Sequence, residues 1–196
     1  MEELPPLVVR AQHAAGEVGM PLVGSSESGP SACLPGVGRF LAVLAAGCVG
    51  GRIGEMGTGA GVGTAWMAGA MPADCHLITV ELDERFAAAA HEVMVGDPRV
   101  EVICGDAWTV LSGRAPYDLL FADGGGNDAA GLVDLLRVGG RLVMDDVTPV
   151  EVLPVDSPFR SEDPKRRFFS GEPRLVATEV VLPDLLNSLL VGTRVR

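Results

Sequence analysis

The chain of 196 residues is 47% hydrophobic and 21% charged, a composition typical of one folded domain, which excludes a disordered chain. Its 26 acidic residues outnumber its 15 basic ones, and the net charge of −11 disfavours nucleic acids and anionic membranes as partners. The longest apolar stretch, 40–51, is too short to cross a bilayer and the N-terminus does not resemble a secretory signal, so we expect a cytoplasmic protein.

The first 50 residues predict a helical lead-in that covers the substrate. An Ala-rich helix is expected at Leu7–Ala15 and a second helix at Gly36–Ala46, with a loop rich in glycine and serine between them. Residues 51–196 are expected to form the core. Together the two parts make one predicted domain, 1–196.

From residue 51 onward, short β-rich runs alternate with helical patterns, which is typical of a doubly wound, mostly parallel α/β sheet. Helices are expected at Val62–Met71, Glu84–Val95 and Ala129–Arg137, and Asp83 and Asp128 precede the last two as N-caps. The expected strands are Arg52–Met56, His76–Glu81, Val100–Cys104, Tyr117–Asp123 and Gly140–Asp145.

After residue 146 the chain is rich in proline, which predicts a mobile crossover before two late strands, Leu175–Leu182 and Asn187–Thr193. The Pro183-Asp184 turn between these strands indicates a hairpin, so we expect the sheet to end antiparallel. The basic segment 164–169 could recruit an anionic acceptor, although a solvated stretch that balances an acidic protein is the simpler interpretation.

The four cysteines include no C-x-x-C pair and the chain has only three histidines, so neither a zinc site nor a disulfide framework is expected. We expect Cys33, Cys48, Cys75 and Cys104 to be buried free thiols. Trp108 is expected to be buried at an edge of the sheet.

A glycine-rich loop, Glu55-Met56-Gly57-Thr58-Gly59-Ala60-Gly61-Val62-Gly63-Thr64, lies where the first core strand ends and a helix begins. Glycines let the backbone approach a ligand closely, and the N-terminus of the helix offers unpaired N–H groups. Glu81 ends the next strand, 20 residues after Gly61, at the spacing at which an acid commonly binds ribose hydroxyls. The loop and the acid together predict a cofactor of the adenosine type.

The loop does not fit the dinucleotide fingerprint G-x-G-x-x-G/A, because no small residue stands five positions after any of its first three glycines. A nicotinamide oxidoreductase is therefore disfavoured. Glu55 directly precedes the glycines, where it would repel a pyrophosphate and attract a cationic amino-acid group. S-adenosylmethionine carries such a group.

The E-x-G-T-G-x-G loop resembles motif I of the class I S-adenosylmethionine-dependent methyltransferases. Further blocks over about 36–146 resemble the catechol and caffeoyl-CoA O-methyltransferase family. These blocks are Ile78-Thr79-Val80-Glu81, Cys104-Gly105-Asp106-Ala107, the run from Tyr117 to Asp123 and the run from Leu136 to Asp146. The resemblance implies a Rossmann-like methyltransferase fold and an O-methyltransferase activity.

The resemblance also implies how the cofactor lies. Glu55, Gly57 and Gly59 would line the methionine part, Glu81 would hold the ribose, and Asp106 with its neighbour would frame the adenine, while Asp106 can also cap a helix. The implied cofactor-binding residues are Glu55, Gly57, Thr58, Gly59, Gly63, Thr64, Glu81, Leu82, Asp106, Ala107 and Asp123.

In the resembled family a divalent cation lies beside the cofactor, which implies Asp123 as a catalytic residue and Asp123, Asp145 and Asp146 as metal ligands. Such oxygen ligands favour Mg²⁺, which eases the loss of a hydroxyl proton. Asp146 stands where the family usually has Asn, and Gly126 stands where many relatives have a lysine that accepts the proton. The single lysine of the chain, Lys165, lies far along the sequence, so no positioned ammonium is expected.

These observations predict an S-adenosylmethionine-dependent O-methyltransferase that acts on a small catechol-like or phenolic acceptor, with Mg²⁺ as a second cofactor. Two alternatives stay open: an S-adenosylmethionine-binding protein without catalysis, and a methyltransferase for a tRNA base hydroxyl. The acidic charge argues against the second alternative. A homodimer is compatible with the sequence, which carries no signal that tests it.

Overall fold

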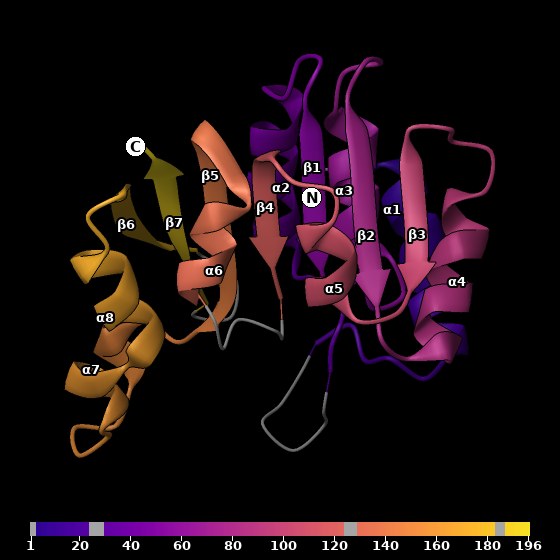
Figure 1. Ribbon diagram of the computed structural model, residues 1–196. Coiled ribbons are helices and arrows are strands. Elements are labelled where there is room, and N and C mark those ends of the chain that lie inside the picture. The colour runs from indigo at the N-terminus through magenta and orange to yellow at the C-terminus, as the bar shows by residue number, and fades with distance from the viewer. Residues whose placement is uncertain (1–2, 24–29, 124–128, 183–186) are drawn as a thin grey trace.

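The computed structural model describes residues 3–23, 30–123, 129–182 and 187–196. Seven strands form one sheet with the order β3-β2-β1-β4-β5-β7-β6 (Figure 1). The strands are β1 (Arg52–Met56), β2 (His76–Glu81), β3 (Val100–Cys104), β4 (Tyr117–Ala122), β5 (Leu136–Val147), β6 (Leu175–Val181) and β7 (Ser188–Arg194).

The directions of the strands confirm the predicted sheet. β1 pairs in parallel with β2 on one side and with β4 on the other, and β3 and β5 extend this parallel part. β7 runs antiparallel to both β5 and β6, as expected for a terminal hairpin. The strand order reverses between β1 and β4. In α/β sheets this switch point is where ligands bind, beyond the carboxyl ends of the strands.

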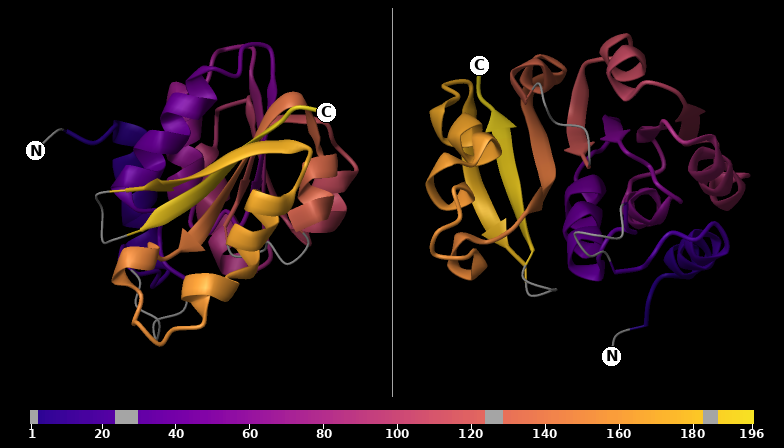
Figure 2. Two further views of the ribbon diagram at one scale, coloured as in Figure 1. Left: turned by 90° about the vertical axis from the view of Figure 1, so that its left-hand side faces the viewer. Right: turned by 90° about the horizontal axis from the view of Figure 1, so that it is seen from below.

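Helices cover both faces of the sheet. Figure 2, seen from below, has α1 to α3 on one side of the strands and α5 and α6 on the other. None of the helices in the described ranges is long and apolar enough to span a bilayer. The helices are α1 (Pro6–Glu17), α2 (Pro35–Ala46), α3 (Val62–Ala70), α4 (Glu84–Met94), α5 (Ala107–Ser112), α6 (Ala129–Asp134), α7 (Phe159–Glu162) and α8 (Pro164–Gly171).

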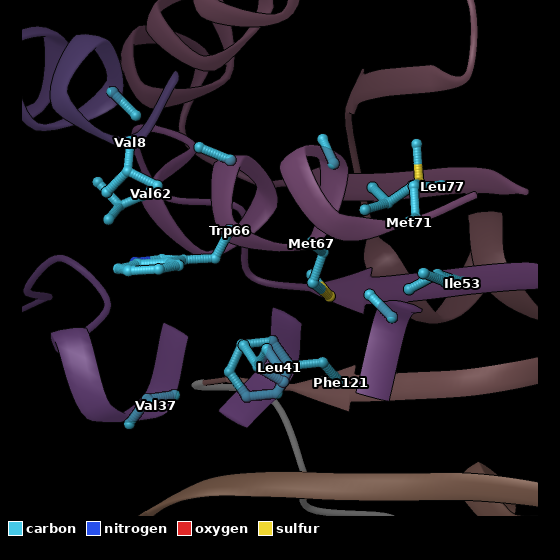
Figure 3. Close-up of a cluster of buried hydrophobic side chains, with 14 of the residues drawn as sticks. Val8, Val37, Leu41, Ile53, Val62, Trp66, Met67, Met71, Leu77 and Phe121 are labelled. Carbon is cyan, nitrogen blue, oxygen red and sulfur yellow. The ribbon is translucent and has the colours of Figure 1, made fainter. Parts of the chain in front are cut away.

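Each face of the sheet has its own hydrophobic core, because successive side chains of a strand point to opposite faces. In β4, Leu119 and Phe121 join the core beneath α1 to α4, and Leu120 and Ala122 join the core beneath α5, α6 and α8. Figure 3 shows Phe121 in the first core beside Leu41 of α2 and near Trp66 of α3. A strand segment covered on both faces is apolar at every position, which explains the apolar run Leu119–Ala122 in β4.

Three of the expected boundaries or segments are wrong. The helix expected at Ala129–Arg137 ends at Asp134, and the strand expected at Gly140–Asp145 runs from Leu136 to Val147, because Leu136 already pairs with Tyr117 of β4. The expected mobile crossover contains the helices α7 and α8. The side chain of Asp163 caps α8 by accepting the N–H of Arg166 at 2.9 Å.

Exposure corrects two other expectations. Cys48 and Cys75 are buried and Cys33 is half-buried, but Cys104 is exposed because it ends the edge strand β3. Trp108 retains 39% exposure on α5 instead of being buried. The expected Pro183-Asp184 turn, the Gly/Ser loop at 24–29 and the glycines at 124–126 lie outside the described residues.

Candidate functional site

The glycine loop leaves β1 at the switch point of the sheet. Gly57, Gly59 and Gly61 have φ values of 87°, 53° and 89°, a backbone conformation that favours glycine. A Cβ atom on Gly57 would lie 2.3 Å from the carbonyl oxygen of Asp123, so the loop passes against the end of β4. α3 begins at Val62, directly after the loop, and its N-terminus therefore faces the same side as the strand ends.

Glu55 lies beneath this loop with 1% of its surface exposed. The hydroxyl of Thr64 donates a hydrogen bond of 2.5 Å to its Oε2. Burial raises the pKa of Glu55 to about 7, although the Thr64 hydrogen bond acts in the opposite direction. A Cβ atom on Gly63 would lie 2.8 Å from Oε1, so the carboxylate reaches the first turn of α3. A buried carboxylate in this position can attract a cationic group of a ligand.

Glu81 folds back toward the glycine loop from the end of β2. Its Oε2 accepts the N–H of Gly59 at 2.8 Å, and its Oε1 accepts the N–H groups of Leu82 at 2.8 Å and Asp83 at 2.9 Å. These bonds fix the carboxylate beside the loop, and Oε2, which has one donor, can accept a further hydrogen bond. Thr58 is also fixed, because its hydroxyl lies 2.5 Å from that of Thr79 on β2.

Asp106 caps α5, as its position before that helix allows. Its Oδ1 accepts the N–H of Thr109 at 2.8 Å and the Thr109 hydroxyl at 2.5 Å. The N–H of Gly105 donates to the carbonyl of Glu81 at 2.8 Å, which holds the ends of β3 and β2 together. The two acids predicted to bind the cofactor are thus on adjacent strand ends, and the exposed ring of Trp108 follows on α5.

A small pocket lies over the glycine loop, and the helical lead-in closes one side of it. Sequence reasoning missed the lead-in residues, because no pattern in the sequence distinguishes them from other apolar and small residues. Burial raises the pKa of the Cys33 thiol, and the nearby carboxylates of Asp145, Asp123 and Glu55 raise it further. The lining comprises Met20, Ser31, Ala32, Cys33, Glu55, Gly57, Thr58, Gly59, Ala60, Val62, Gly63, Phe121 and Asp123.

Three predicted carboxylates lie at the carboxyl ends of β4 and β5, which are neighbours in the sheet: Asp123 directly after β4, and Asp145 and Asp146 in the last part of β5. Asp123 follows β4, and its pKa is raised by burial and by the charges of Asp145 and Asp146. Asp145 is 7% exposed, and its Oδ1 accepts the amide N–H of Asn187 at 2.9 Å and the backbone N–H of Asp146 at 2.8 Å. Burial also raises the pKa of Asp145. The side chains are therefore close enough for their charges to act on one another.

Their arrangement does not fit the predicted three-carboxylate metal site. Within residues 3–23, 30–123, 129–182 and 187–196, no group of three or more His, Cys, Asp and Glu side chains could hold a metal ion. Oδ1 of Asp145 is occupied by two N–H donors, which a cation would have to displace. Asp146 is exposed at a φ of 61°. Mg²⁺ stays a prediction of the sequence that this geometry does not support.

Lys165 is the main correction to the predicted site. It lies in the first turn of α8, and its Nζ donates to the carbonyl oxygen of Asp145 at 2.8 Å. Its charge acts to lower the pKa of both Asp123 and Asp145. The expectation that no ammonium is positioned here is wrong, and the basic segment 164–169 is not merely a solvated stretch.

Known proteins that resemble the chain are methyltransferases. Residues 55–147 match a family model described as a methyltransferase domain. The catechol O-methyltransferase of Niastella koreensis is 35% identical over 124 residues, which cover 59% of this chain and 52% of that protein. The matched residues form a methyltransferase domain, and the chain is similar to S-adenosylmethionine-dependent O-methyltransferases. It spans between about half and two thirds of the length of the curated relatives it matches.

Solved methyltransferase structures share the fold. The O-methyltransferase TomG of Streptomyces achromogenes, in complex with S-adenosylmethionine, is 25% identical and superposes with a TM-score of 0.73 over 99% of this chain and 92% of TomG. An O-methyltransferase from Bacillus cereus, in complex with S-adenosylhomocysteine, is 24% identical and has a TM-score of 0.74 over 99% of this chain and 93% of that one. The methyltransferase fold therefore extends over the whole described chain, including the lead-in and the hairpin.

Proposed function

We propose that the protein transfers a methyl group from S-adenosylmethionine to a hydroxyl of a small phenolic acceptor. The observation that carries the proposal is the glycine loop at the switch point, with buried Glu55 beneath it and Glu81 bonded to Gly59. TomG was solved with this cofactor bound, and the Niastella relative is named for a catechol acceptor. These two names support the cofactor and the acceptor class.

The described residues fit the cofactor part by part. Glu55 would attract the ammonium of the methionine part, and the N–H groups in the first turn of α3 would face its carboxylate. Glu81 would accept hydrogen bonds from the ribose hydroxyls. Ala107 and Trp108, on the exposed side of α5, would lie along the adenine. The cofactor supplies a methyl group on a sulfonium ion.

The acceptor must then meet the methyl group near Asp123, which lines the same pocket as Glu55 and Gly57. Asp123 can accept a hydrogen bond from an acceptor hydroxyl and so orient it. Orientation is the main contribution a protein can make to a direct displacement on the methyl carbon. The lead-in, through Met20 and Cys33, would exclude water from this point.

Calorimetry and a transfer assay test the proposal together. S-adenosylhomocysteine is expected to bind, whereas NAD is not, because the loop lacks the dinucleotide glycine spacing. Mass spectrometry should then detect a mass increase of one methyl group on a catechol or another acidic phenol. Binding without transfer to any hydroxylated acceptor would favour the alternative of a non-catalytic cofactor-binding protein. Absence of S-adenosylhomocysteine binding would overturn the proposal.

A further inference from the structure

A network of ion pairs fixes the start of α8 against the sheet. The guanidinium of Arg166 donates to both carboxylate oxygens of Glu179 on β6, at 2.8 and 2.7 Å, and to the carbonyl of Thr148 at 2.6 Å. Asp163 caps the helix and also pairs with Arg166. We call these four residues the α8 clamp. Because Lys165 is the immediate neighbour of Arg166, the clamp determines where the Lys165 ammonium lies.

The hydrogen bond of Lys165 leaves its positive charge in place. Its partner is the carbonyl oxygen of Asp145, a neutral group, while Oδ1 of Asp145 is bonded to Asn187. Asp145 lies near the end of β5, the neighbour of β4, and Asp123 directly after β4 lines the pocket at the glycine loop. Lys165 therefore places a cation at the strand end next to the one that carries Asp123, and its charge acts on Asp123.

This end of the site is otherwise strongly acidic. The charges of Asp145, Asp146 and Glu55 raise the pKa of Asp123, and the charge of Asp146 raises that of Asp145. The carboxylates of Asp145, Asp123 and Glu55 also raise the pKa of the Cys33 thiol. An ionised acceptor oxygen would be repelled by these groups unless a cation lies close to it. The described residues do not fit a three-carboxylate metal site, so a cation of the protein itself is the natural candidate.

We propose that Lys165, held by the α8 clamp, binds the acceptor as its phenolate and supplies the positive charge that Mg²⁺ was expected to supply. The inference rests on the proposed function. The carboxylate of Asp123 lies directly after β4, and the ammonium of Lys165, from α8, is bonded to Asp145 near the end of the neighbouring β5. This pair matches two adjacent hydroxyls of which one is ionised. The neutral hydroxyl donates to Asp123, and the ionised oxygen faces Lys165. A catechol has this pattern.

The group transfer balances without a metal or a protein base. The acidic hydroxyl gives its proton to solvent as the phenolate binds. An electron pair of the phenolate oxygen then forms the bond to the methyl carbon, while the bond between that carbon and sulfur breaks and its electron pair stays on sulfur. The products are a methyl ether and a neutral thioether. Lys165 keeps all its protons throughout.

A nitrocatechol is the probe, because its anion absorbs at a longer wavelength than its neutral form. The full chain is saturated with S-adenosylhomocysteine at a pH at which half of the free probe is ionised. Wild type is expected to increase the ionised fraction of bound probe, and Lys165→Met is expected to abolish the increase. Lys165→Arg keeps the positive charge and should retain most of the increase in the ionised fraction. Arg167→Met, which removes an exposed charge from the same helix, is the matched control and should behave as wild type.

Methyl transfer is measured on the same variants with and without excess chelator. We expect kcat/KM of Lys165→Met to fall about 10- to 100-fold, with S-adenosylhomocysteine affinity unchanged, and we expect wild type to stay active in chelator. The inference would be overturned if wild type lost its activity or its ionisation of the probe in chelator. It would also be overturned if Lys165→Met ionised the probe normally. In each of these cases the proposed function would stand. Probe ionisation that depends on Lys165 but leads to no transfer would instead overturn the proposed function.

Discussion

At the scale of single residues, the site depends on backbone positions that few side chains tolerate and on carboxylates with several partners. Gly57 combines a left-handed backbone with a close approach to the carbonyl of Asp123. Glu81 bonds three backbone N–H groups, including that of Gly59. Both residues therefore shape the loop before any ligand binds, which is the preorganisation that tight binding of a small molecule requires.

Replacement of Gly57 by alanine is expected to destabilise the protein by about 2–4 kcal/mol, because the new Cβ would be both strained and 2.3 Å from a backbone oxygen. Gly69→Ala is the control. Gly69 lies in α3 with nothing within 4 Å of a Cβ, so this change should be neutral or stabilise by about 0.5–1 kcal/mol. Urea denaturation of both variants measures the difference, and equal stabilities would contradict the close approach.

Replacement of Glu81 by alanine is expected to weaken S-adenosylhomocysteine binding by about 1.5–3 kcal/mol, at least tenfold in Kd, because a charged partner of the ribose is lost. Glu81→Gln keeps one acceptor oxygen for Gly59 and should lose less. Glu84→Ala, an exposed acid in the first turn of α4, is the control for net charge. Calorimetry decides: an unchanged Kd for Glu81→Ala would remove Glu81 from the cofactor site.

At the scale of elements, α8 connects the crossover to the terminal hairpin. Arg166 of α8 pairs with Glu179 of β6, and the Ser188 hydroxyl of β7 donates to the same carboxylate at 2.6 Å. Phe169 is buried against the core beneath this part of the sheet. The helix is therefore held by both a polar contact and an apolar one, and its position decides which residues reach the end of β5.

Arg166→Met is expected to lower the free energy of unfolding by about 1.5–3 kcal/mol, since Glu179 and Asp163 lose their charged partner in a half-buried place. Arg167→Met removes an equal charge from the exposed side of α8 and should change stability by less than about 0.5 kcal/mol. The double variant Arg166→Met/Glu179→Met should recover part of the loss. If it is no more stable than Arg166→Met in thermal and urea unfolding, the ion pair is not what fixes α8.

At the scale of the whole molecule, several acidic groups lie in poorly solvated positions, where ionisation is least favourable. The protein has a net charge of −11. Glu55 and Asp145 are buried and Asp123 is half-buried near the carboxyl ends of β1, β4 and β5, and all three have raised pKa values. In the folded protein these groups hold their protons more tightly than in the unfolded chain. Ionising them in place therefore costs stability, and a cationic ligand would restore part of it.

The free energy of unfolding of the ligand-free protein is expected to decrease as pH rises from about 4.5 to about 7, because Glu55 has a pKa of about 7 when folded and an ordinary one when unfolded. The stabilising effect is present at the acidic end of this range and is lost at the neutral end. Glu55→Gln should reduce the slope. Urea denaturation of both proteins at several pH values measures this slope. A free energy of unfolding that rises between pH 5 and 7 in wild type but not in Glu55→Gln would contradict the raised pKa.

The sequence determined the parts of the fold that depend on local patterns. β1, β2 and β3 begin and end where predicted, since buried parallel strands are short apolar runs between turn residues. The glycines at 57, 59 and 61 do adopt the left-handed backbone that a ligand loop requires. Such features depend only on residues that are close together in the chain, so a single sequence is enough to predict them. The boundary between α6 and β5 was wrong because pairing with β4 decided it.

Only the tertiary structure decided what meets at the acceptor end of the site. Lys165 reaches the backbone carbonyl of Asp145, 20 residues before it, and Asn187 reaches the carboxylate of Asp145 from 42 residues away. Met20 and Cys33 come to the glycine loop from the lead-in. No local pattern marks these residues, because their positions depend on how α8, β7 and the lead-in pack against the finished sheet. The sequence showed that no lysine stands at the expected place after β4, but it did not show that Lys165 of α8 reaches the end of β5.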